Sequence, residues 1–471
     1  MRAHEAGALH AEVLQAAPAW LRPPADPNDL APDLWSANVA RGAGGRLAVA
    51  GVAVDAIARE FGTPVFVVDE DDFRQRCRAF LATMDDGRGG TFGDVYYAGK
   101  AFLTVASARW VDEEGLGLDV CTGGELAVAL RAGFPVSRIT FHGNNKSRAE
   151  IDRALANDVR RFVVDSSIEI QRLAAAAAAR SVRAQVAVRV NVGVEAHTHE
   201  YIATAHEDQK FGFALADGVA AGAVAAVLAE PSLELIGLHA HIGSQIFDSA
   251  AFEVSARRLV SLHAHIKAEH GFEPREMGLG GGFGVAYTMQ DRPSTPGDLI
   301  GGLRAAVSIA CEAAGVTVPR LSIEPGRAIA GPAAFTLYEV GTVKVVRLDG
   351  GARRAYISVD GGMSDNIRPA LYGAAYSCAL ASRASLAPPM LARVVGKHCE
   401  AGDVVVQDEF LPADVTPGDL LAVPGTGAYC RAMSSNYNHV PRPPVIAVRD
   451  GKAGVLIRRE EEEDLFRLDV G

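Results

Sequence analysis

Four short motifs carry side chains that could do chemistry, and each follows a short apolar run. Lys100 is an amine that could form a Schiff base with a carbonyl compound. His241 and Ser244 lie close together, and glycines crowd the segment 278–284. The last motif, 324–327, reads Glu-Pro-Gly-Arg. Singly, these motifs are also typical of a surface lysine, a buried histidine, a tight turn and an ion pair at a strand end.

The last two motifs suit an anionic, nitrogen-containing ring. A carboxylate such as Glu324 beside a pyridine nitrogen keeps that ring protonated and makes it an electron sink. The planar fork of Arg327 matches a carboxylate or a phosphate. Backbone amides of the glycine run could cradle a phosphate. The run is not a dinucleotide fingerprint, because Phe283 stands where the third glycine should be.

The histidines allow a second interpretation. His239 and His241 have the period-2 spacing that puts two side chains on one face of a strand. A zinc site would need a third ligand, for which His197 and His199 are candidates, but no His-Glu-x-x-His spacing occurs. We interpret His239 as a buried core histidine and His241 as a residue that stacks on a ring. No metal is expected.

The elements that position these motifs alternate regularly. The first five β-type runs begin 21 to 24 residues apart, and helical stretches such as 147–156 and 168–179 fill the gaps. Eight such runs occur: 95–98, 116–120, 139–142, 162–165, 186–191, 235–241, 277–280 and 321–324. This α/β alternation predicts a (β/α)8 TIM-type barrel, with an open doubly wound sheet as the alternative.

In such a barrel, catalytic side chains gather at the carboxyl ends of the strands. The lysine follows the first strand, the histidine and serine the sixth, the glycines the seventh and Glu-Pro-Gly-Arg the eighth. Together they describe a phosphate-bearing aldehyde with an acidic partner for its ring nitrogen. The predicted cofactor is pyridoxal 5′-phosphate.

The sequence pattern changes near residue 335. Alternating or apolar runs rich in β-branched residues follow, separated by Gly and Pro, and predict a C-terminal β-rich domain over 335–471. The barrel is expected over 69–334. Residues 1–45 read as an irregular arm, and 46–68 as a segment that joins the β-rich domain, with Asp55 capping a short helix.

The β-rich part holds further candidates. Cys399 stands between His398 and Glu400, which suits a proton donor better than a core thiol. Arg368 and the tyrosines 372 and 429 add a cation and two phenols.

Composition excludes several classes of function. The net charge of −11 gives no basic footprint for nucleic acid or for anionic membrane surfaces. The six cysteines form no Cys-x-x-Cys pair, which favours a reducing compartment and predicts a cytoplasmic protein. Glycine makes up about a tenth of the chain (49 of 471 residues), so sharp turns and close backbone approaches are expected.

Motifs along nearly the whole chain resemble those of the diaminopimelate decarboxylases, in the alanine racemase-like, fold type III class of pyridoxal-phosphate enzymes. The matching motifs lie in the family's order: 97–101, 118–126, 142–147, 241–245, 324–327, 398–403 and 426–429. Gly99 departs modestly from the pattern, because many relatives have another residue there.

The resemblance implies roles for individual residues. Lys100 would bind the cofactor covalently, His241 would stack on its ring, and Cys399 would reprotonate the carbon that loses CO2. A second set would hold the phosphate and the pyridine nitrogen: Ser244, Gly282, Glu324, Pro325, Gly326, Arg327 and Tyr429. A third set would hold the substrate: Arg327, Arg368, Tyr372, Glu400 and Tyr429.

The implied reaction is the decarboxylation of meso-2,6-diaminopimelate to L-lysine and CO2, the last step of lysine biosynthesis. Family members are homodimers, so Cys399 and Glu400 are expected to serve Lys100 of the partner subunit. The alternatives are a decarboxylase of ornithine, arginine or carboxynorspermidine, and a non-catalytic homologue that binds pyridoxal phosphate. An alanine racemase is disfavoured by Glu324, and a zinc hydrolase on the same barrel is a distant alternative.

Overall fold

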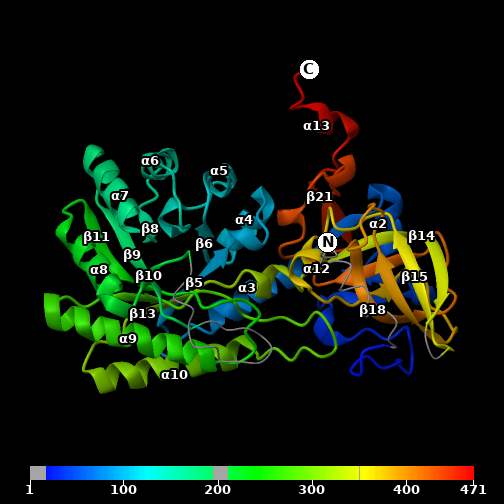
Figure 1. Ribbon diagram of the computed structural model, residues 1–471, viewed down its shortest axis with the longest axis horizontal. Helices are drawn as coiled ribbons and strands as arrows, with labels where there is room; N and C mark the ends of the chain where they lie inside the picture. Colours follow the sequence, from blue (N-terminus) through cyan, green and yellow to red (C-terminus); the bar gives the residue numbers. More distant parts are fainter. Residues whose placement is uncertain (1–16, 195–209, 349–350) are drawn as a thin grey trace, which may run out of the picture. The chain divides into compact units, whose positions relative to one another are not determined.

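The computed structural model describes residues 17–194, 210–348 and 351–471 (Figure 1). The chain forms two compact units. One, the barrel unit, consists of Arg74–Val285 and Arg292–Ile329. The other, the β-rich unit, consists of the chain up to Phe73 with Ala286–Asp291 and Ala330–Gly471.

Eight parallel strands of the barrel unit close into a ring. Each strand pairs with the next along the chain, and the last, β13, pairs with the first, β5. The predicted (β/α)8 barrel is therefore confirmed. The strands are β5 (Gly93–Ala98), β6 (Gly117–Val120), β7 (Ile139–Phe141), β8 (Arg161–Val164), β9 (Ala184–Asn191), β11 (Leu233–His239), β12 (Glu276–Gly278) and β13 (Arg320–Ile323). A two-residue strand, β10 (Phe213–Ala214), pairs with β9 outside the ring.

Helices follow the barrel strands, and several of them begin at polar caps. Thr104 and Ser147 each accept a hydrogen bond from the backbone three residues on, which satisfies an otherwise unpaired helix N–H. The helices are α3 (Glu70–Ala82, which enters from the β-rich unit), α4 (Val105–Glu113), α5 (Gly123–Ala132), α6 (Arg148–Ala156), α7 (Ser167–Ala179), α8 (Val219–Ala229), α9 (Ala250–His270), α10 (Pro296–Ala314) and α11 (Arg327–Ala330).

The β-rich unit is built on one long mixed sheet with the strand order β18-β17-β15-β14-β4-β20-β21. Strand β19 pairs with β14 and β16, and β1, β2 and β3 form a small sheet of their own. The strands are β1 (Val39–Arg41), β2 (Leu47–Val49), β3 (Val52–Ala53), β4 (Val65–Asp69), β14 (Ala334–Arg347), β15 (Arg353–Val359), β16 (Ala379–Leu380), β17 (Pro389–Val395), β18 (Val404–Pro412), β19 (Leu420–Pro424), β20 (Val445–Arg449) and β21 (Lys452–Ile457). The helices α2 (Val54–Phe61), α12 (Arg368–Tyr372) and α13 (Glu462–Phe466) complete it.

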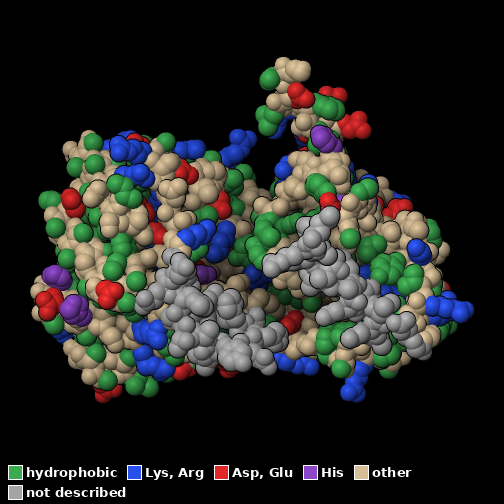
Figure 2. Space-filling model, viewed as in Figure 1, with side chains coloured by type: hydrophobic (Ala, Val, Ile, Leu, Met, Phe, Trp, Pro, Cys, Tyr) green, Lys and Arg blue, Asp and Glu red, His purple; other side chains and the backbone are tan. Residues whose placement is uncertain are grey.

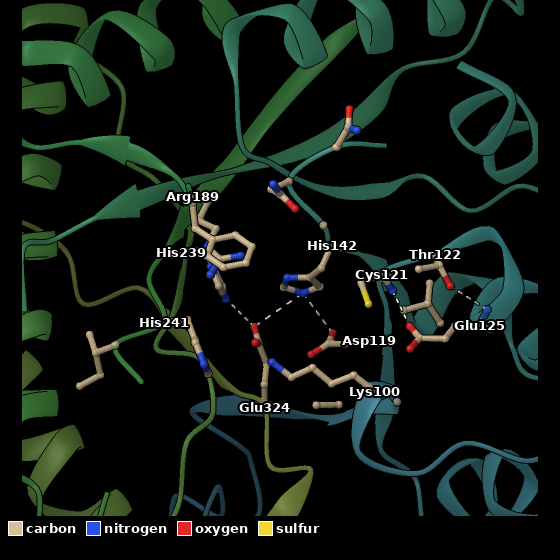
Figure 3. Close-up of a pocket in the computed structure, with 18 of the residues that line it drawn as sticks. Lys100, Asp119, Cys121, Thr122, Glu125, His142, Arg189, His239, His241 and Glu324 are labelled. Carbon is tan, nitrogen blue, oxygen red and sulfur yellow. Dashed lines mark hydrogen bonds and ion pairs between the residues drawn. The ribbon is translucent and has the colours of Figure 1, made fainter. Parts of the chain in front are cut away.

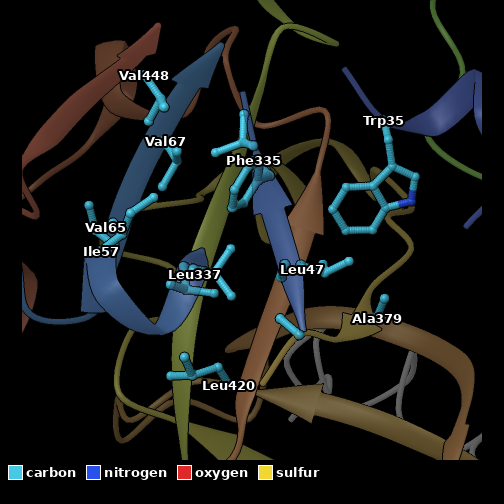
Figure 4. Close-up of a cluster of buried hydrophobic side chains, with 14 of the residues drawn as sticks. Trp35, Leu47, Ile57, Val65, Val67, Phe335, Leu337, Ala379, Leu420 and Val448 are labelled. Carbon is cyan, nitrogen blue, oxygen red and sulfur yellow. The ribbon is translucent and has the colours of Figure 1, made fainter. Parts of the chain in front are cut away.

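One hydrophobic cluster joins both ends of the chain in this unit (Figure 4). Trp35 and Leu47 from the N-terminal part pack with Phe335 and Leu337 of β14. The rings of Trp35 and Phe335 lie 6.1 Å apart. Strand β4 lies between β14 and β20, so Val67 is enclosed by later parts of the sequence. The apolar residues near the N-terminus thus have their burial partners more than 250 residues away in the chain.

Two local expectations differ from the structure. The segment expected to be irregular up to residue 45 contains β1. Helix α2 begins at Val54, with Ala53 rather than Asp55 at the N-cap. The Asp55 carboxylate instead bonds Arg59 one turn later, at 2.9 Å, because an acidic side chain inside the first turn can reach a basic one at i+4.

Charged side chains of both signs are scattered over the face drawn in Figure 2, and acidic ones gather at α13 near the C-terminus. There Asp464 pairs with Arg458 at 2.5 Å, so part of the acidic run is neutralised. Within the described ranges, no helix has the length and apolar character needed to cross a membrane.

We expect Phe335→Ala to lower the free energy of unfolding by about 3–5 kcal/mol, because it empties a fully enclosed site at the centre of the β-rich core. The matched control is Val345→Ala in the same strand, whose side chain is exposed and whose loss should cost within about 0.5 kcal/mol. Urea unfolding followed by circular dichroism measures both. Equal midpoints for the two variants would contradict the assignment of this cluster as the core.

Candidate active site

The carboxyl ends of the barrel strands surround a cavity of about 570 Å³ (Figure 3). This volume is within the usual range for a small-molecule site, roughly 300–1,000 Å³. Most of its charged and polar walls come from strand ends: Lys100, Asp119, Cys121, Thr122, Glu125, His142, Arg189, His239, His241 and Glu324.

Lys100 lies in the single turn Gly99–Ala101 that follows β5. The hydroxyl of Tyr97 donates to the carbonyl of Phe102 at 2.7 Å and so ties the two sides of this turn together. A Cβ atom at Gly99 would lie 2.9 Å from the Asp119 carbonyl oxygen, which explains the glycine there. The Lys100 side chain extends into the cavity, and its nitrogen points toward Glu324 (Figure 3).

Glu324 is the centre of a buried cluster of acids and imidazoles. Its Oε1 lies 2.7 Å from Nε2 of His239 and 3.7 Å from Nε2 of His142. The same His142 nitrogen lies 3.3 Å from a carboxylate oxygen of Asp119. Neither Asp119 oxygen has a hydrogen-bond partner among the described residues, nor does Nε2 of His142 or Nδ1 of His239. Such buried polar atoms call for a further polar group in the cavity.

Burial and mutual repulsion drive the two carboxyl groups to different charge states. Burial acts to raise the pKa of Glu324, but the facing His239 and His142 outweigh it and hold that pKa well below its ordinary value. Burial and then the charge of Glu324 raise the pKa of Asp119 well above its ordinary value. Glu324 is therefore the stronger acid of the pair, and Asp119 is the one that more readily keeps its proton.

Burial also keeps the imidazoles neutral. It lowers the pKa of His142 to about 4, and it lowers the pKa of His239. For His241, burial and then the charge of Lys100 lower the pKa well below its usual value. Glu324 thus faces neutral imidazoles and Lys100. Its negative charge can therefore pair with a cationic group bound in the cavity.

His241 forms the next wall, and the glycine segment packs against it. The amide of Gly281 contacts Nδ1 of His241 at 3.2 Å, which fixes the ring. A Cβ atom at Gly281 would lie 2.2 Å from the Glu324 carbonyl oxygen, and one at Gly282, where φ is +105°, 2.3 Å from the Gly243 carbonyl oxygen. These two glycines are required where loop backbones cross each other.

Ser244 and Arg327 meet although they lie 83 positions apart. A terminal nitrogen of Arg327 donates to the Ser244 hydroxyl at 2.8 Å. The preceding residues of this turn are fixed against the lysine turn: the Pro325 carbonyl accepts from the Ala98 amide at 3.3 Å, and a Cβ atom at Gly326 would lie 3.0 Å from the Ala98 side chain.

A second buried charge network lies behind the cavity wall. The Lys146 amine is fully buried and donates to Glu169 at 2.6 Å and to the Gly143 carbonyl at 2.8 Å. The other Glu169 oxygen accepts from the Asp165 amide, and the Asp165 carboxylate lies 3.5 Å from Arg189. Arg189 lines the cavity, so this network fixes a cavity cation from behind.

The remaining predicted site residues belong to the β-rich unit. Arg368 is buried with its guanidinium 4.8 Å from the ring centre of Tyr287 and 5.6 Å from that of Tyr376. Cys399 is exposed, as is Tyr372 at the end of α12. The other two also have defined surroundings. Glu400 accepts a hydrogen bond from Tyr437, and Tyr429 has a positive φ of 60°.

Comparisons with known proteins identify the family of this chain. The family described as "Pyridoxal-dependent decarboxylase, pyridoxal binding domain" matches residues 70–331. The diaminopimelate decarboxylase of Mycobacterium tuberculosis is 53% identical over 445 residues, which cover 94% of this chain and 98% of that protein. The chain belongs to the diaminopimelate decarboxylase family of pyridoxal-dependent decarboxylases.

Solved structures agree with this family. Diaminopimelate decarboxylase from M. jannaschii, crystallised with L-lysine, superposes with a TM-score of 0.85 at 30% identity, over 93% of this chain and 99% of that one. A lysine/ornithine decarboxylase from Vibrio vulnificus complexed with putrescine reaches 0.69 at 22% identity, over 84% and 97% of the two chains. Because the identity to the Vibrio vulnificus enzyme is only 22%, that similarity shows a shared fold and no more.

Within the decarboxylase barrel, the structure brings together Lys100, His241 and Glu324 in one cavity, and Ser244 with Arg327. Sequence reasoning gave no role to several cavity residues. Among them, Asp119, His142 and Arg189 follow the same rule that pointed to Lys100, because each lies within two residues of the carboxyl end of a strand. His239 is buried as expected, but it bonds Glu324 and is therefore part of the site.

The zinc interpretation paired His239 with His241, whereas the structure groups His239 with His142 and Glu324, whose ligand atoms lie within 4.8 Å of one another. His197 and His199 lie outside the described residues. Cys121 also lines this cavity, but burial raises its pKa to about 12, so it is a thiol and not the thiolate that binds metals.

We expect His142 to make stability depend on pH. Its pKa falls from 6.5 to about 4 on folding, so in this interval the unfolded chain binds a proton that the folded chain does not. The free energy of unfolding should therefore decrease as pH falls through this window, by about 2 kcal/mol between about pH 7.5 and about pH 5. His142→Asn should lose less stability than the wild type over that range, by this amount.

The control is the exposed His265→Asn, which should keep the wild-type pH dependence of unfolding. Identical pH dependence for His142→Asn and the wild type would contradict the burial of a neutral imidazole at this position.

Proposed function

We propose that this chain decarboxylates meso-2,6-diaminopimelate to L-lysine and CO2, with pyridoxal 5′-phosphate as its cofactor. The observation that carries the proposal is a lysine amine directed at a buried, ionised Glu324 across a 570 Å³ cavity. It occurs in a chain that is 53% identical to diaminopimelate decarboxylases over almost their whole length.

The cavity residues fit pyridoxal phosphate. The lysine amine suits its aldehyde, the Glu324 carboxylate suits a protonated ring nitrogen, and the neutral His241 ring suits stacking on the pyridine. Ser244 and Arg327, joined at 2.8 Å, and the backbone near Gly282 suit the phosphate. Together with Pro325, Gly326 and Tyr429, these residues are proposed to hold the cofactor.

When bound, pyridoxal phosphate supplies an aldehyde that captures the substrate's amine and a ring that accepts the electrons left by departing CO2. Glu324 would hold a proton at the ring nitrogen, because its pKa lies well below its ordinary value and the carboxylate keeps its negative charge. Asp119 would stay protonated beside it, so the cavity carries one carboxylate charge rather than two.

The far end of diaminopimelate carries both an ammonium and a carboxylate, and it needs a partner of each sign. We assign the carboxylate to Arg368 and Arg327, and the ammonium to Glu400, with Tyr372 and Tyr429 beside them. The rings of Tyr287 and Tyr376 against the Arg368 guanidinium restrict its motion, which lowers the entropy cost of binding a carboxylate.

Cys399 is proposed to donate the proton that replaces CO2 on the reacting carbon. Its side chain is exposed on the β-rich unit, which is consistent with service to a second subunit. The active enzyme is therefore proposed to be a homodimer in which Cys399 and Glu400 complete the site of the partner. All six cysteines are free thiols, which supports a cytoplasmic location.

The alternative is a decarboxylase of ornithine, arginine or carboxynorspermidine. Ornithine and arginine have no distal carboxylate, so the buried, ring-flanked Arg368 favours diaminopimelate over these two. A non-catalytic homologue that binds pyridoxal phosphate would not need Lys100 and Cys399, and the chain has both.

The purified protein should absorb near ~420 nm, as a protonated Schiff base of pyridoxal phosphate does, and release CO2 from meso-diaminopimelate much faster than from ornithine. Lys100→Ala should lose both the covalent absorbance band and the activity, because the amine is gone. A chelator should leave the rate unchanged. No band in the wild type would contradict the cofactor, and a preference for ornithine would contradict the substrate.

Cys399→Ala should reduce turnover by about 10²–10⁴-fold, the usual contribution of a positioned proton donor, while the absorbance band remains. Unchanged turnover would remove Cys399 from the reaction.

Mixing the inactive Lys100→Ala and Cys399→Ala proteins under conditions that exchange subunits tests the shared site. Half the dimers would be mixed and each would contain one intact site, so activity should recover to about a quarter of the wild-type level in a two-fold symmetric dimer. No recovery despite demonstrated exchange would contradict sharing of Cys399 between subunits.

A further inference from the structure

The loop that carries Cys399 and Glu400 is held at its base by a buried carboxylate. One oxygen of Asp403 accepts the Met363 amide at 2.6 Å, and the other accepts the His398 amide at 2.8 Å. A Cβ atom at Gly396 would lie 2.2 Å from the same carboxylate. The loop therefore has little freedom to move at its start or its end.

The imidazole next to Cys399 is also fixed. His398 is buried, with Nδ1 at 3.0 Å from the amide oxygen of Asn438 and Nε2 at 2.9 Å from the Ser364 hydroxyl. Because an amide oxygen only accepts, Nδ1 donates the proton, and Nε2 accepts from the serine. Both ring nitrogens of His398 are thus hydrogen-bonded, which fixes the residue that directly precedes Cys399.

Glu400, the residue after Cys399, is held by Tyr437, which directly precedes Asn438 in the chain. The Tyr437 hydroxyl donates to Oε1 of Glu400 at 2.5 Å, and the Tyr437 ring lies 5.4 Å from that of His398. Asn438 has a φ of +52°, which turns the two consecutive side chains toward different targets. Tyr437 and Asn438 therefore bind the residues on both sides of Cys399.

We propose that Tyr437 is a positioning residue for substrate recognition through Glu400. The inference rests on the proposed function, in which Glu400 binds the distal ammonium of the substrate. Glu400 is on an exposed loop and without Tyr437 would occupy several rotamers. The phenol engages one carboxylate oxygen, fixes the side chain and leaves the other oxygen for the ammonium. The conformational entropy of the Glu400 side chain is therefore already lost in the free enzyme, so substrate binding does not have to order it.

The test uses the holoenzyme with Tyr437→Phe, which keeps the ring and removes only the hydroxyl. We expect KM for meso-diaminopimelate to rise about fivefold, which corresponds to about 1 kcal/mol, with kcat within about twofold of the wild type. The matched control is Tyr356→Phe in β15, a half-buried tyrosine of the same unit, which should change neither parameter. Tyr437→Leu, a second variant that also lacks the hydroxyl, should raise KM at least as much.

Glu400→Gln separates this inference from the proposed function. Its KM should rise, and adding Tyr437→Phe to it should raise KM little further, because the two residues act through one contact. If Glu400→Gln raises KM and Tyr437→Phe does not, the role of Tyr437 is overturned and the proposed function stands. If Glu400→Gln leaves KM unchanged, both the role of Glu400 and that of Tyr437 are overturned. A fall in kcat without a change in KM for Tyr437→Phe would also overturn the inference.

Discussion

Burial of charge at the centre of the barrel constrains the rest of the site. Two carboxyl groups, Asp119 and Glu324, lie near one imidazole in a space where ionising both would be costly. The histidines stabilise the charge on Glu324, and that charge in turn keeps Asp119 protonated. The buried Glu324 carboxylate facing Lys100 provides the single negative charge that would stabilise a cationic heterocycle bound between them.

Ring closure of the eight strands allows such a cluster to form. Lys100, Asp119, His142, His239 and Glu324 come from positions spread over more than 220 residues, yet each lies within two residues of the carboxyl end of a parallel strand. Because these ends point the same way around a closed ring, their side chains converge. The loops that follow must then cross within a small space, and the absence of a side chain at Gly281 and Gly282 permits this.

Much of this architecture could be predicted from the sequence, because barrel strands are short, apolar and regularly spaced. All eight predicted strands overlap the observed ones closely. Within the C-terminal β-rich domain, which was predicted only as a whole, strands β17 and β21 are hard to recognise for a physical reason. Strand β17 carries the buried Arg393, whose charge is balanced by Asp408 on the neighbouring β18, and β21 is largely exposed, so neither has a clear apolar pattern.

The candidate site was predictable only where one residue type implied one chemistry. Lys100 and Glu324 could be found because an amine and a carboxylate at strand ends have few structural uses. His239 was interpreted as a core residue, since burial and catalysis give a lone histidine the same sequence context. Its hydrogen bond to Glu324 depends on β11 and β13 lying on either side of β12 in the ring, and no local pattern contains that information.

The two units also fix the side chains proposed to act in the reaction by different physical means. In the barrel, the residues are immobilised by burial, and their charge states follow from the loss of water. On the β-rich unit, Cys399 and Glu400 are exposed, so burial cannot order them. The hydrogen bond that Tyr437 donates to Glu400 and the one that Asn438 accepts from His398 supply that order while leaving the thiol accessible. A group that must reach a substrate outside its own unit needs this second kind of order, because burial within the unit would remove it from reach.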